Sequence, residues 1–300
     1  MGRGRAPLTA TVVHRRDEWA SAMAEARGGG PVGLVPTMGG LHGGHLSLIR
    51  RAAAACPTVA VTVYVNPLQF GPGEDLARYP GTLDADVEAA AAAGARIVFA
   101  PNGEEMWPEP PATTVHVAEV SEAWEGASRP GHFDGVATIV AKLLSLAGPC
   151  AAFFGEKDFQ QLAVVRRMAR DLSLPVRVVG CPTVRDPDGL ALSTRNAYLG
   201  PDERAVAPAL YWALLAGKRA VEDGRAADPE EVAGAMRDAL AREPRFELDY
   251  AAAVDPETLR IPARLGGEVR LLIAAQLGAA RLIDNIPAHS PLPPADHEES

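Results

Sequence analysis

The chain has 300 residues and a mass of 31.5 kDa, enough for one large domain or two domains of ordinary size. Apolar residues make up 47% of the sequence and charged residues 22%, so we expect a folded chain with a sizeable core. The 29 basic and 38 acidic residues leave a net charge of −9. This charge argues against nucleic-acid and anionic-membrane partners, because both reward a basic surface, but it allows a small anionic ligand held by local cations.

Cysteine usage and hydropathy indicate the compartment. Cys56, Cys150 and Cys181 form no CxxC pair, so we interpret them as structural thiols. The N-terminal stretch is basic but is not followed by an apolar run, which argues against a signal peptide. No window approaches the roughly 18 uncharged apolar residues of a membrane-spanning helix. These features predict a cytoplasmic protein that stays off membranes.

Strand-like apolar runs alternate with helix-like stretches in the first two thirds of the chain. The expected strands cover residues 32–37, 58–65, 95–101, 150–155 and 176–184, and the expected helices cover residues 44–56, 84–93, 135–147 and 158–172. Continuous apolar strands that alternate with helices are typical of a parallel sheet covered on both faces. The pattern therefore predicts an α/β, doubly wound domain.

The pattern changes near residue 186. Helix-like stretches at 202–224 and 229–242 are followed by three strand-like runs at 249–255, 269–278 and 281–287. Helices followed by strands predict a separate, smaller α+β domain. We therefore expect domains at 1–185 and 186–286, and a Pro-rich, acidic and disordered tail at 287–300.

A glycine-rich segment, Met38 to His45 (MGGLHGGH), stands where the first expected strand gives way to a helix. Its glycines allow close backbone approach, and a helix N-terminus offers N–H groups to an anion. His42 and His45 are three residues apart and share a helix face, which favours a phosphate site over a turn with two incidental histidines. The chain lacks the Gly-Lys-Ser/Thr of a P-loop, the dinucleotide GxGxxG spacing and the zinc motif HExxH.

Polar side chains follow two more expected strands. Asn66 and Gln69 come directly after strand 58–65, where amides can bind hydroxyl and carboxylate groups, although Asn-Pro also starts turns. Lys157 and Gln161 come after strand 150–155 and would face the same way at the start of a helix. Asp158 pairs with Gln161 in the spacing of a capping box, so we assign Asp158 to the cap and Lys157 to a ligand.

Two loops add further candidates. Arg129 and His132 lie on a Gly/Pro loop before the helix expected at 135, where an arginine is as often solvated as functional. Ser193, Thr194 and Arg195 follow a turn near the domain boundary and combine two hydroxyl donors with a guanidinium suited to phosphate oxygens. Such a run by itself is usually a polar loop, so its meaning depends on the other segments.

Together these segments resemble a known family. The His-x-x-His turn with a downstream Ser/Thr/basic loop is similar to the HIGH and KMSKS signatures of a nucleotidyltransferase superfamily. PTMGGLHGGH, VNPLQFG, RPGHFDGV, FFGEKDFQQL and PTVRDPDGLALSTRN occur in the order of the pantothenate synthetase (pantoate–β-alanine ligase) family. The resemblance covers about residues 10 to 286 and includes the closing RLIDNIP.

The resemblance implies a Rossmann-like catalytic domain and a smaller lid domain. It implies an ATP-dependent ligase that condenses (R)-pantoate with β-alanine through pantoyl adenylate and releases AMP and pyrophosphate. It also implies Mg²⁺ with the ATP, and a homodimer. Asp84 and Asp86 are candidate metal ligands, although an exposed helix start explains both equally well.

Roles follow by motif position. The resemblance implies catalytic roles for His42, His45, Lys157 and Arg195. ATP would be bound by Met38, Gly39, Gly40, Leu41, His42, Gly43, Gly44, His45, Gly155, Glu156, Lys157, Asp158, Val184, Leu192, Ser193, Thr194 and Arg195. Pantoate or β-alanine would be held by Asn66, Gln69, Arg129, His132 and Gln161.

Two alternatives stay open. Another adenylyl- or cytidylyltransferase of the superfamily would share both signatures and release pyrophosphate, but it would need no amine substrate. A nucleotide-binding regulator with an inactive site would lack one of the key side chains, whereas His42, His45 and Lys157 are all present. AMP formation that depends on the amine separates the ligase from both.

Overall fold

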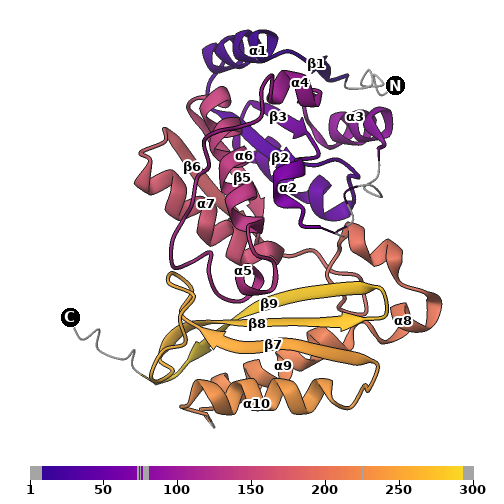
Figure 1. Ribbon diagram of the computed structural model, residues 1–300, viewed down its shortest axis with the longest axis vertical. Coiled ribbons are helices and arrows are strands. Elements are labelled where there is room, and N and C mark those ends of the chain that lie inside the picture. The colour runs from indigo at the N-terminus through magenta and orange to yellow at the C-terminus, as the bar shows by residue number, and fades with distance from the viewer. Residues whose placement is uncertain (1–8, 73, 75, 77–80, 225, 293–300) are drawn as a thin grey trace, which may run out of the picture. The chain divides into compact units, whose positions relative to one another are not determined.

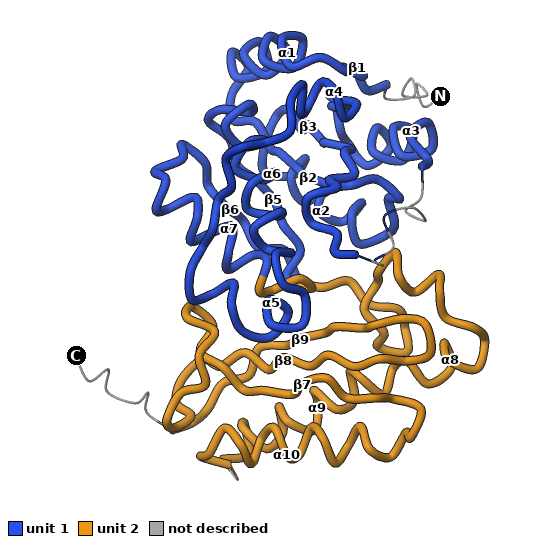
Figure 2. The backbone as a smooth tube through the Cα atoms, in the orientation of Figure 1, with its two compact units in different colours: residues 1–156, 161–182 blue, residues 157–160, 183–300 orange. Residues whose placement is uncertain are grey.

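A computed structural model describes residues 9–72, 74, 76, 81–224 and 226–292. The chain divides into two compact units, which Figure 2 shows in different colours. The first unit holds residues 1–156 and 161–182, and the second holds residues 157–160 and 183–300. The single boundary expected near residue 186 did not anticipate that residues 157–160 group with the C-terminal part of the chain.

The first unit is built on a six-stranded parallel sheet (Figure 1). Across the sheet the order is β1-β4-β3-β2-β5-β6, and every described strand pair along this order is parallel. The strands are β1 (Thr11–Val13), β2 (Val32–Thr37), β3 (Thr58–Val63), β4 (Ile97–Phe99), β5 (Cys150–Gly155) and β6 (Val176–Cys181). The chain runs from β2 outward through β3 to β4 and then resumes on the other side with β5 and β6. The predicted α/β, doubly wound fold is confirmed.

Helices accompany this sheet, and the longer ones bury apolar side chains. They are α1 (Arg16–Gly28), α2 (Gly43–Ala55), α3 (Leu83–Ala93), α4 (Gly103–Met106), α5 (Glu125–Ser128), α6 (His132–Ala147) and α7 (Phe159–Asp171), with two 3₁₀ turns, η1 (Pro67–Gln69) and η3 (Glu156–Asp158). Ile49 and Ala52 of α2 are fully buried and belong to the same core as Val35 of β2 and Phe153 of β5. This packing holds the start of α2 at the end of β2.

Two N-terminal elements, β1 and α1, were missed by the sequence analysis. Only Trp19 and Met23 of α1 are buried, so the helix has a narrow apolar stripe and a weak periodic signal. Trp19 stacks on Phe99 of β4 with 4.9 Å between ring centroids. This aromatic contact packs α1 against the sheet, although the polar composition of the helix gives little sign of it in the sequence.

The second unit pairs an antiparallel sheet with helices. Its strands β7 (Phe246–Val254), β8 (Gly267–Leu277) and β9 (Ala280–Ser290) lie in chain order. Helices α9 (Ala209–Glu222) and α10 (Pro229–Leu240) lie together beside this sheet (Figure 1), and they share one core with it. The short elements α8 (Pro201–Val206) and η4 (Thr194–Tyr198) precede them. The three-stranded sheet confirms the predicted α+β character.

Two expectations for this unit were wrong in detail. The helix expected at 202–224 is two helices, because Pro208 has no N–H to continue the helical hydrogen bonds and α9 restarts at Ala209. Residues 287–290 were expected in a disordered tail but belong to β9, which continues to Ser290; Ser290 pairs with Gly267 and is 1% exposed. The Pro-rich composition concealed an in-out alternation over these residues, and residues 293–300 lie outside the described part.

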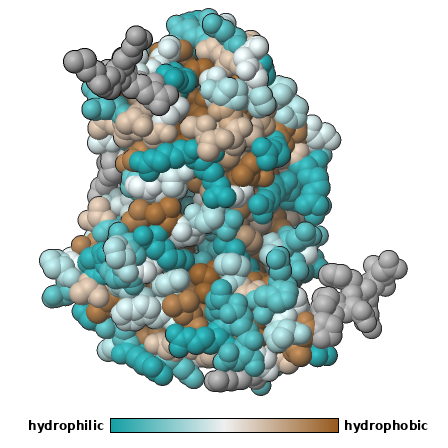
Figure 3. All heavy atoms as spheres, turned by 180° about the vertical axis from the view of Figure 1, so that it is seen from behind, coloured by the Kyte–Doolittle hydropathy of each residue, from teal (hydrophilic) through white to brown (hydrophobic). Residues whose placement is uncertain are grey.

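Exposed apolar side chains are spread over the surface. Figure 3 shows hydrophobic residues interspersed with hydrophilic ones on the face that it displays. The large exposed apolar residues belong to different segments, and they are Val12, Leu68, Leu76, Leu172, Trp212 and Ile261. Within the described ranges, no helix is both long and apolar enough to span a membrane.

Helix α6 passes so close to η1 that Gly135 has no room for a side chain. A Cβ at Gly135 would lie 2.2 Å from the carbonyl oxygen of Leu68 and 2.6 Å from the backbone nitrogen of Gln69. We expect Gly135→Ala to lower the free energy of unfolding by about 3 kcal/mol, because backbone atoms would have to move. Gly28→Ala is the control: nothing lies within 4 Å of its Cβ, and it is exposed at a helix end. Urea unfolding measures both, and equal stability would contradict the close approach.

Candidate active site

Three neighbouring strands of the first unit end at one edge of the sheet. β2 pairs with β3 through its last residue, Thr37 opposite Val63, and pairs with β5 on its other side. Ligands of open α/β sheets bind beyond the carboxyl ends of the strands, where the strand order reverses. In this sheet that place is β2, between β3 and β5. Three of the segments predicted from the sequence follow these strands: Met38 to His45, Asn66 with Gln69, and Lys157 with Gln161.

The glycine-rich segment turns sharply between β2 and α2. Gly39 and Gly40 have φ angles of +89° and +64°, a region that side-chain-bearing residues rarely adopt. These two residues reverse the chain, and His42 becomes the N-cap residue of α2. The predicted strand–turn–helix placement of Met38 to His45 is therefore present.

The two histidines of this segment lie against each other. His42 Nδ1 accepts a hydrogen bond from the Gly44 N–H at 3.1 Å, and His45 Nδ1 accepts one from the His42 N–H at 3.4 Å. The ring centroids are 4.2 Å apart. Since Nδ1 is an acceptor in both rings, each neutral ring carries its proton on Nε2. The geometry thus places two adjacent imidazole N–H groups at a helix N-terminus, and such groups can donate to phosphate oxygens.

A buried carboxylate, Asp86 of α3, lies behind the same turn. It is 3% exposed, and it accepts hydrogen bonds from the backbone N–H groups of Gly40 at 2.9 Å and Leu41 at 2.7 Å. The expectation of an exposed helix start holds for Asp84 and is wrong for Asp86. The sequence offered no signal for this contact, because the turn and Asp86 are far apart in the chain.

These carboxylates do not build a metal cage. Within the described ranges, no three His, Cys, Asp or Glu side chains gather closely enough to hold an ion. Both Asp86 oxygens already accept backbone N–H donors. Mg²⁺ in nucleotide sites is held by one or two carboxylates together with substrate phosphates.

Asn66, Gln69, Arg129 and His132 form one network in the first unit. Asn66 is 1% exposed, and its Nδ2 donates to the side-chain oxygen of Gln69 and to the carbonyl oxygen of Gly135, both at 3.1 Å. His132 Nδ1 donates to the Gln69 carbonyl at 2.8 Å. Gln69 is thus held through both its side chain and its backbone.

Arg129 is less exposed than a typical loop arginine. Its Nε and Nη2 donate to the two carboxylate oxygens of Glu74 at 2.8 and 2.6 Å, and its Nη1 lies 3.0 Å from His132 Nε2. The side chains of Arg129 and Glu74 are 15% and 26% exposed, and the Arg129 hydrogen bonds hold the pKa of Glu74 below its usual range. Much of the Arg129 charge is therefore committed within the protein.

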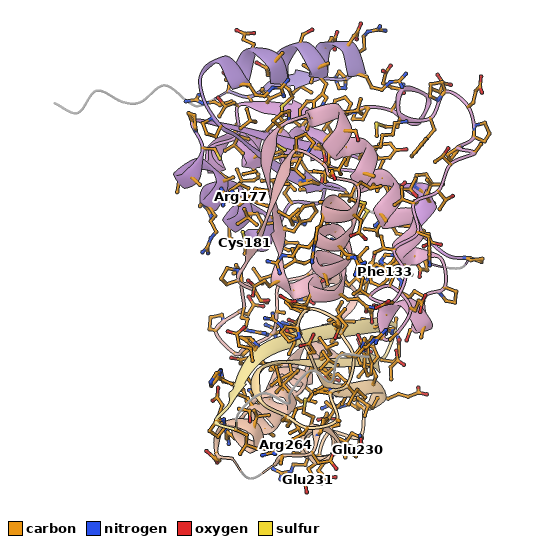
Figure 4. The ribbon with its side chains drawn as sticks, turned by 90° about the vertical axis from the view of Figure 1, so that its left-hand side faces the viewer. Phe133, Arg177, Cys181, Glu230, Glu231 and Arg264 are labelled. Atoms are coloured by element: carbon orange, nitrogen blue, oxygen red, sulfur yellow. The ribbon has the colours of Figure 1, made fainter. Side chains whose placement is uncertain are left out.

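The sequence analysis expected His132 in a loop before residue 135. In the structure, His132 is instead the first residue of α6. Gly131, with φ +80°, is the N-cap residue of α6, so the helix begins three residues earlier than expected. Burial, together with the Arg129 charge, lowers the pKa of His132 to about 4. The ring of Phe133, labelled on α6 in Figure 4, lies 5.0 Å from the His132 ring. His132 is therefore a neutral imidazole near pH 7, with its proton on Nδ1.

Lys157 belongs to the second unit and lies in η3, ahead of α7. Its Nζ donates to Asp158 Oδ1 at 3.2 Å, and its carbonyl oxygen accepts from Asn285 Nδ2 at 2.7 Å. Arg270 is buried, stacks over Phe159 at 4.0 Å and donates to Asn285 Oδ1 at 2.7 Å. Asn285 lies in the closing RLIDNIP, but sequence reasoning assigned it no role.

The loop from Val184 to Arg195 is held by hydrogen bonds between its own residues. The Leu192 N–H donates to the Val184 carbonyl at 2.9 Å, and the Ser193 hydroxyl accepts from the Arg195 N–H at 3.2 Å, which caps η4 at Thr194. Arg185 makes a two-pronged ion pair with the buried Asp284, at 2.6 and 2.9 Å. The sequence analysis did not single out this pair, although both residues lie in segments that it quoted.

The remaining candidates occupy ordinary positions. Gly155 ends β5 opposite Cys181 of β6, Glu156 begins η3, and Gln161 lies half-buried in the first turn of α7. The structure thus assembles the glycine turn and the Asn66–His132 network within the first unit. It assembles Lys157, Asp158 and the Val184–Arg195 loop within the second.

Comparisons with known proteins show which family this chain is similar to. The family model for pantoate-beta-alanine ligase matches residues 11–287. The pantothenate synthetase of Saccharopolyspora erythraea is 51% identical over 286 residues, which cover 95% of this chain and 93% of that protein. The enzyme of that name from Thermus thermophilus is 52% identical over 270 residues, 89% of this chain and 97% of the other.

Solved structures are similar as well. The crystal structure of pantothenate synthetase from Thermus thermophilus superposes with a TM-score of 0.87 at 50% identity, covering 92% of this chain and 98% of that one. Pantoate-beta-alanine ligase from Francisella tularensis, complexed with beta-gamma ATP and beta-alanine, has a TM-score of 0.76 at 29% identity, covering 93% and 97%.

The depressed pKa of His132 predicts a pH dependence of stability. The unfolded imidazole takes up a proton near pH 6.5 and the folded one only near pH 4, so stability is full above pH 6.5 and falls as the pH drops towards 4. His132→Gln removes this titration. We therefore expect wild type to lose up to about 3 kcal/mol more than the variant between pH 7 and pH 4. Urea unfolding at several pH values measures it, and parallel profiles would contradict the neutral, buried assignment.

Proposed function

The chain belongs to the pantoate–β-alanine ligase family, and on this premise we propose that its ATP-dependent condensation of pantoate with β-alanine passes through pantoyl adenylate. The observation that carries the proposal is the pair of imidazoles at the N-terminus of α2, beyond the carboxyl end of β2. Two adjacent N–H donors at a helix N-terminus suit the growing charge of a phosphoryl group. The runner-up transferase would use the same donors without an amine.

The proposed reaction has two steps. A pantoate carboxylate oxygen attacks the α-phosphorus of ATP, and the bond to the β-phosphate bridging oxygen breaks and releases pyrophosphate. The β-alanine amine then attacks the acyl carbon, loses a proton, and expels AMP. Neither step needs a covalent bond to the protein, so the protein contributes mainly by positioning and charge stabilisation.

We assign the nucleotide contacts of the first unit to Met38–His45, Gly155 and Glu156. The Nε2–H groups of His42 and His45 would donate to phosphate oxygens, most strongly as the α-phosphorus gains its fifth substituent. In the second unit, Lys157, Asp158, Val184 and Leu192–Arg195 would also bind ATP, with Lys157 and Arg195 supplying positive charge. We propose that the second unit acts as a lid that protects the acyl adenylate from water.

The predicted basic residues of the first unit, Arg129 and His132, supply less positive charge to the site than their number indicates. The net charge of −9 suggests that anions must be gathered by a local set of cations. Yet Arg129 is balanced by Glu74, and the low pKa of His132 leaves it neutral. Anion binding in the first unit would therefore depend largely on directed N–H donors and on a helix N-terminus. Such fixed dipoles need no reorganisation when charge develops.

We assign pantoate and β-alanine to Gln69 and Gln161. The contacts described above support this for Gln69, because Asn66 and His132 hold it at its side chain and its carbonyl. The same contacts support positioning roles for Asn66 and His132. Arg129 would orient His132 while its charge is balanced by Glu74.

Three further features complete the proposal. Mg²⁺ would enter with ATP and neutralise triphosphate oxygens. Two copies would associate through the first unit, in which β6 is an outer strand of the sheet. We propose a cytoplasmic enzyme, because its nucleotide substrate is abundant there and its three cysteines are unpaired.

The decisive assay measures AMP formed from ATP. With pantoate and β-alanine both present, we expect AMP and pyrophosphate in equal amounts. Without β-alanine, we expect at most one equivalent of pyrophosphate per site and no steady release of AMP. Continuous turnover without the amine would favour the rival transferase, and no AMP under any condition would overturn the proposal.

The catalytic assignments predict matched losses. His45→Ala and Lys157→Ala should each lower kcat for adenylate formation by about 10²- to 10³-fold, because each removes a donor to the developing charge. His116→Ala and Lys218→Ala are the controls, since these side chains lie in surface ion pairs. Isotope exchange between pyrophosphate and ATP in the presence of pantoate isolates the first step. Near-normal exchange in either test variant would disprove its role.

A further inference from the structure

Asp86 is a buried carboxylate with no role in the mechanism described so far. Its Oδ2 accepts the Gly40 N–H at 2.9 Å and the Thr82 hydroxyl at 3.2 Å, and its Oδ1 accepts the Leu41 N–H at 2.7 Å. It is 3% exposed, whereas Asp84 in the same helical turn is exposed. A charged group buried this deeply is stable only when its oxygens are hydrogen-bonded, and here both are.

The turn needs such an acceptor. Gly39 and Gly40 reverse the chain with positive φ angles, and glycine pairs have much conformational freedom to lose. The N–H groups of Gly40 and Leu41 follow β2 and precede α2, so the sheet and the helix do not bind them. A carboxylate accepts both, whereas the side-chain amide of an asparagine accepts with its oxygen alone and turns a donor towards the other N–H.

The space behind the turn fits Asp86 closely. A Cβ at Gly39 would lie 3.0 Å from Asp86 Oδ2 and 3.1 Å from Val63 Cγ1. The Gly39 N–H lies 3.3 Å from the Thr37 hydroxyl oxygen, and that hydroxyl in turn donates to the Thr62 carbonyl at 2.6 Å. The segment is therefore pinned at three consecutive N–H groups, from Gly39 to Leu41, directly before His42.

We propose that Asp86 is a positioning residue for the first step of the reaction: by holding the N–H groups of Gly40 and Leu41, it holds His42 and His45 at the α-phosphate of ATP. The inference rests on the proposed function, since it needs those histidines to meet the nucleotide. Asp86 itself touches no substrate. Its negative charge is spread over two N–H donors and a hydroxyl, which limits its repulsion of the triphosphate.

The test compares Asp86→Asn with Asp84→Asn. Both remove one carboxylate from the first turn of α3, but only the former breaks a contact to the turn. We expect Asp86→Asn to lower kcat/KM for ATP by about 10- to 100-fold in the first step, while KM for β-alanine stays within about twofold. Asp84→Asn should behave as wild type in both.

Thr82→Val supplies a milder variant in case Asp86→Asn fails to fold. It removes one hydroxyl donor and leaves the carboxylate and both backbone contacts, so we expect a smaller fall in kcat/KM for ATP of about two- to fivefold. Calorimetric titration with ATP alone and thermal unfolding accompany both. A purely structural role would lower the melting temperature of the variants and leave their ATP parameters unchanged.

The outcomes separate the two proposals. Wild type that forms no AMP overturns the proposed function, whatever the variants do. Active wild type together with an Asp86→Asn variant that matches Asp84→Asn in kcat/KM for ATP overturns only the positioning role. If Asp86→Asn does not fold, a Thr82→Val variant indistinguishable from Asp84→Asn overturns the positioning role as well.

Discussion

Backbone hydrogen bonding on both sides of β2 is the constraint on which the first unit depends. Six consecutive residue pairs join β2 to β3, and β5 pairs with β2 on the other side, so the carboxyl ends of three strands share one edge. Leu34 and Val35 lie on opposite faces of β2 and both are fully buried, so a slip by a single residue would place each side chain in space that is packed for another. The register is therefore fixed by burial, and the polar segments are carried to their places by it.

Because β2 is fixed in the sheet, the turn that follows it must reverse the chain within a few residues. The chain has to reverse at once, because the helix that follows packs on the same sheet, and only glycine adopts the required angles readily at positions 39 and 40. The reversal leaves backbone N–H groups outside any regular element, and buried donors need acceptors. Asp86, Thr37 and the two histidines provide them. The proposed phosphate binding would thus rest on a segment whose own backbone N–H groups already have acceptors.

The sequence predicted the strands and the segments at their ends because these signals are local. Apolar runs such as 32–37 and 150–155 and the spacing of His42 and His45 can be seen within ten residues. It did not predict the partners of these segments, such as Asp86 and Asn285, which are brought close only by the fold. Helix α1 was not predicted because its apolar stripe is narrow, and the end of β9 was not predicted because its sequence is rich in proline. Contacts between distant residues carry no periodicity, so pattern reasoning cannot find them.

Three such contacts, including one from the predicted residue His132, share one physical property: each satisfies a backbone group of a segment that is proposed to act on substrate. Asp86 binds the turn before His42, His132 binds the Gln69 carbonyl, and Asn285 binds the Lys157 carbonyl. A hydrogen bond to the backbone fixes position without consuming the functional side chain, and removing its partner leaves a buried group unsatisfied. In the proposed site, precision would therefore depend on residues that act through the backbone of others, and the buried polar contacts of these residues make them sensitive points for folding as well.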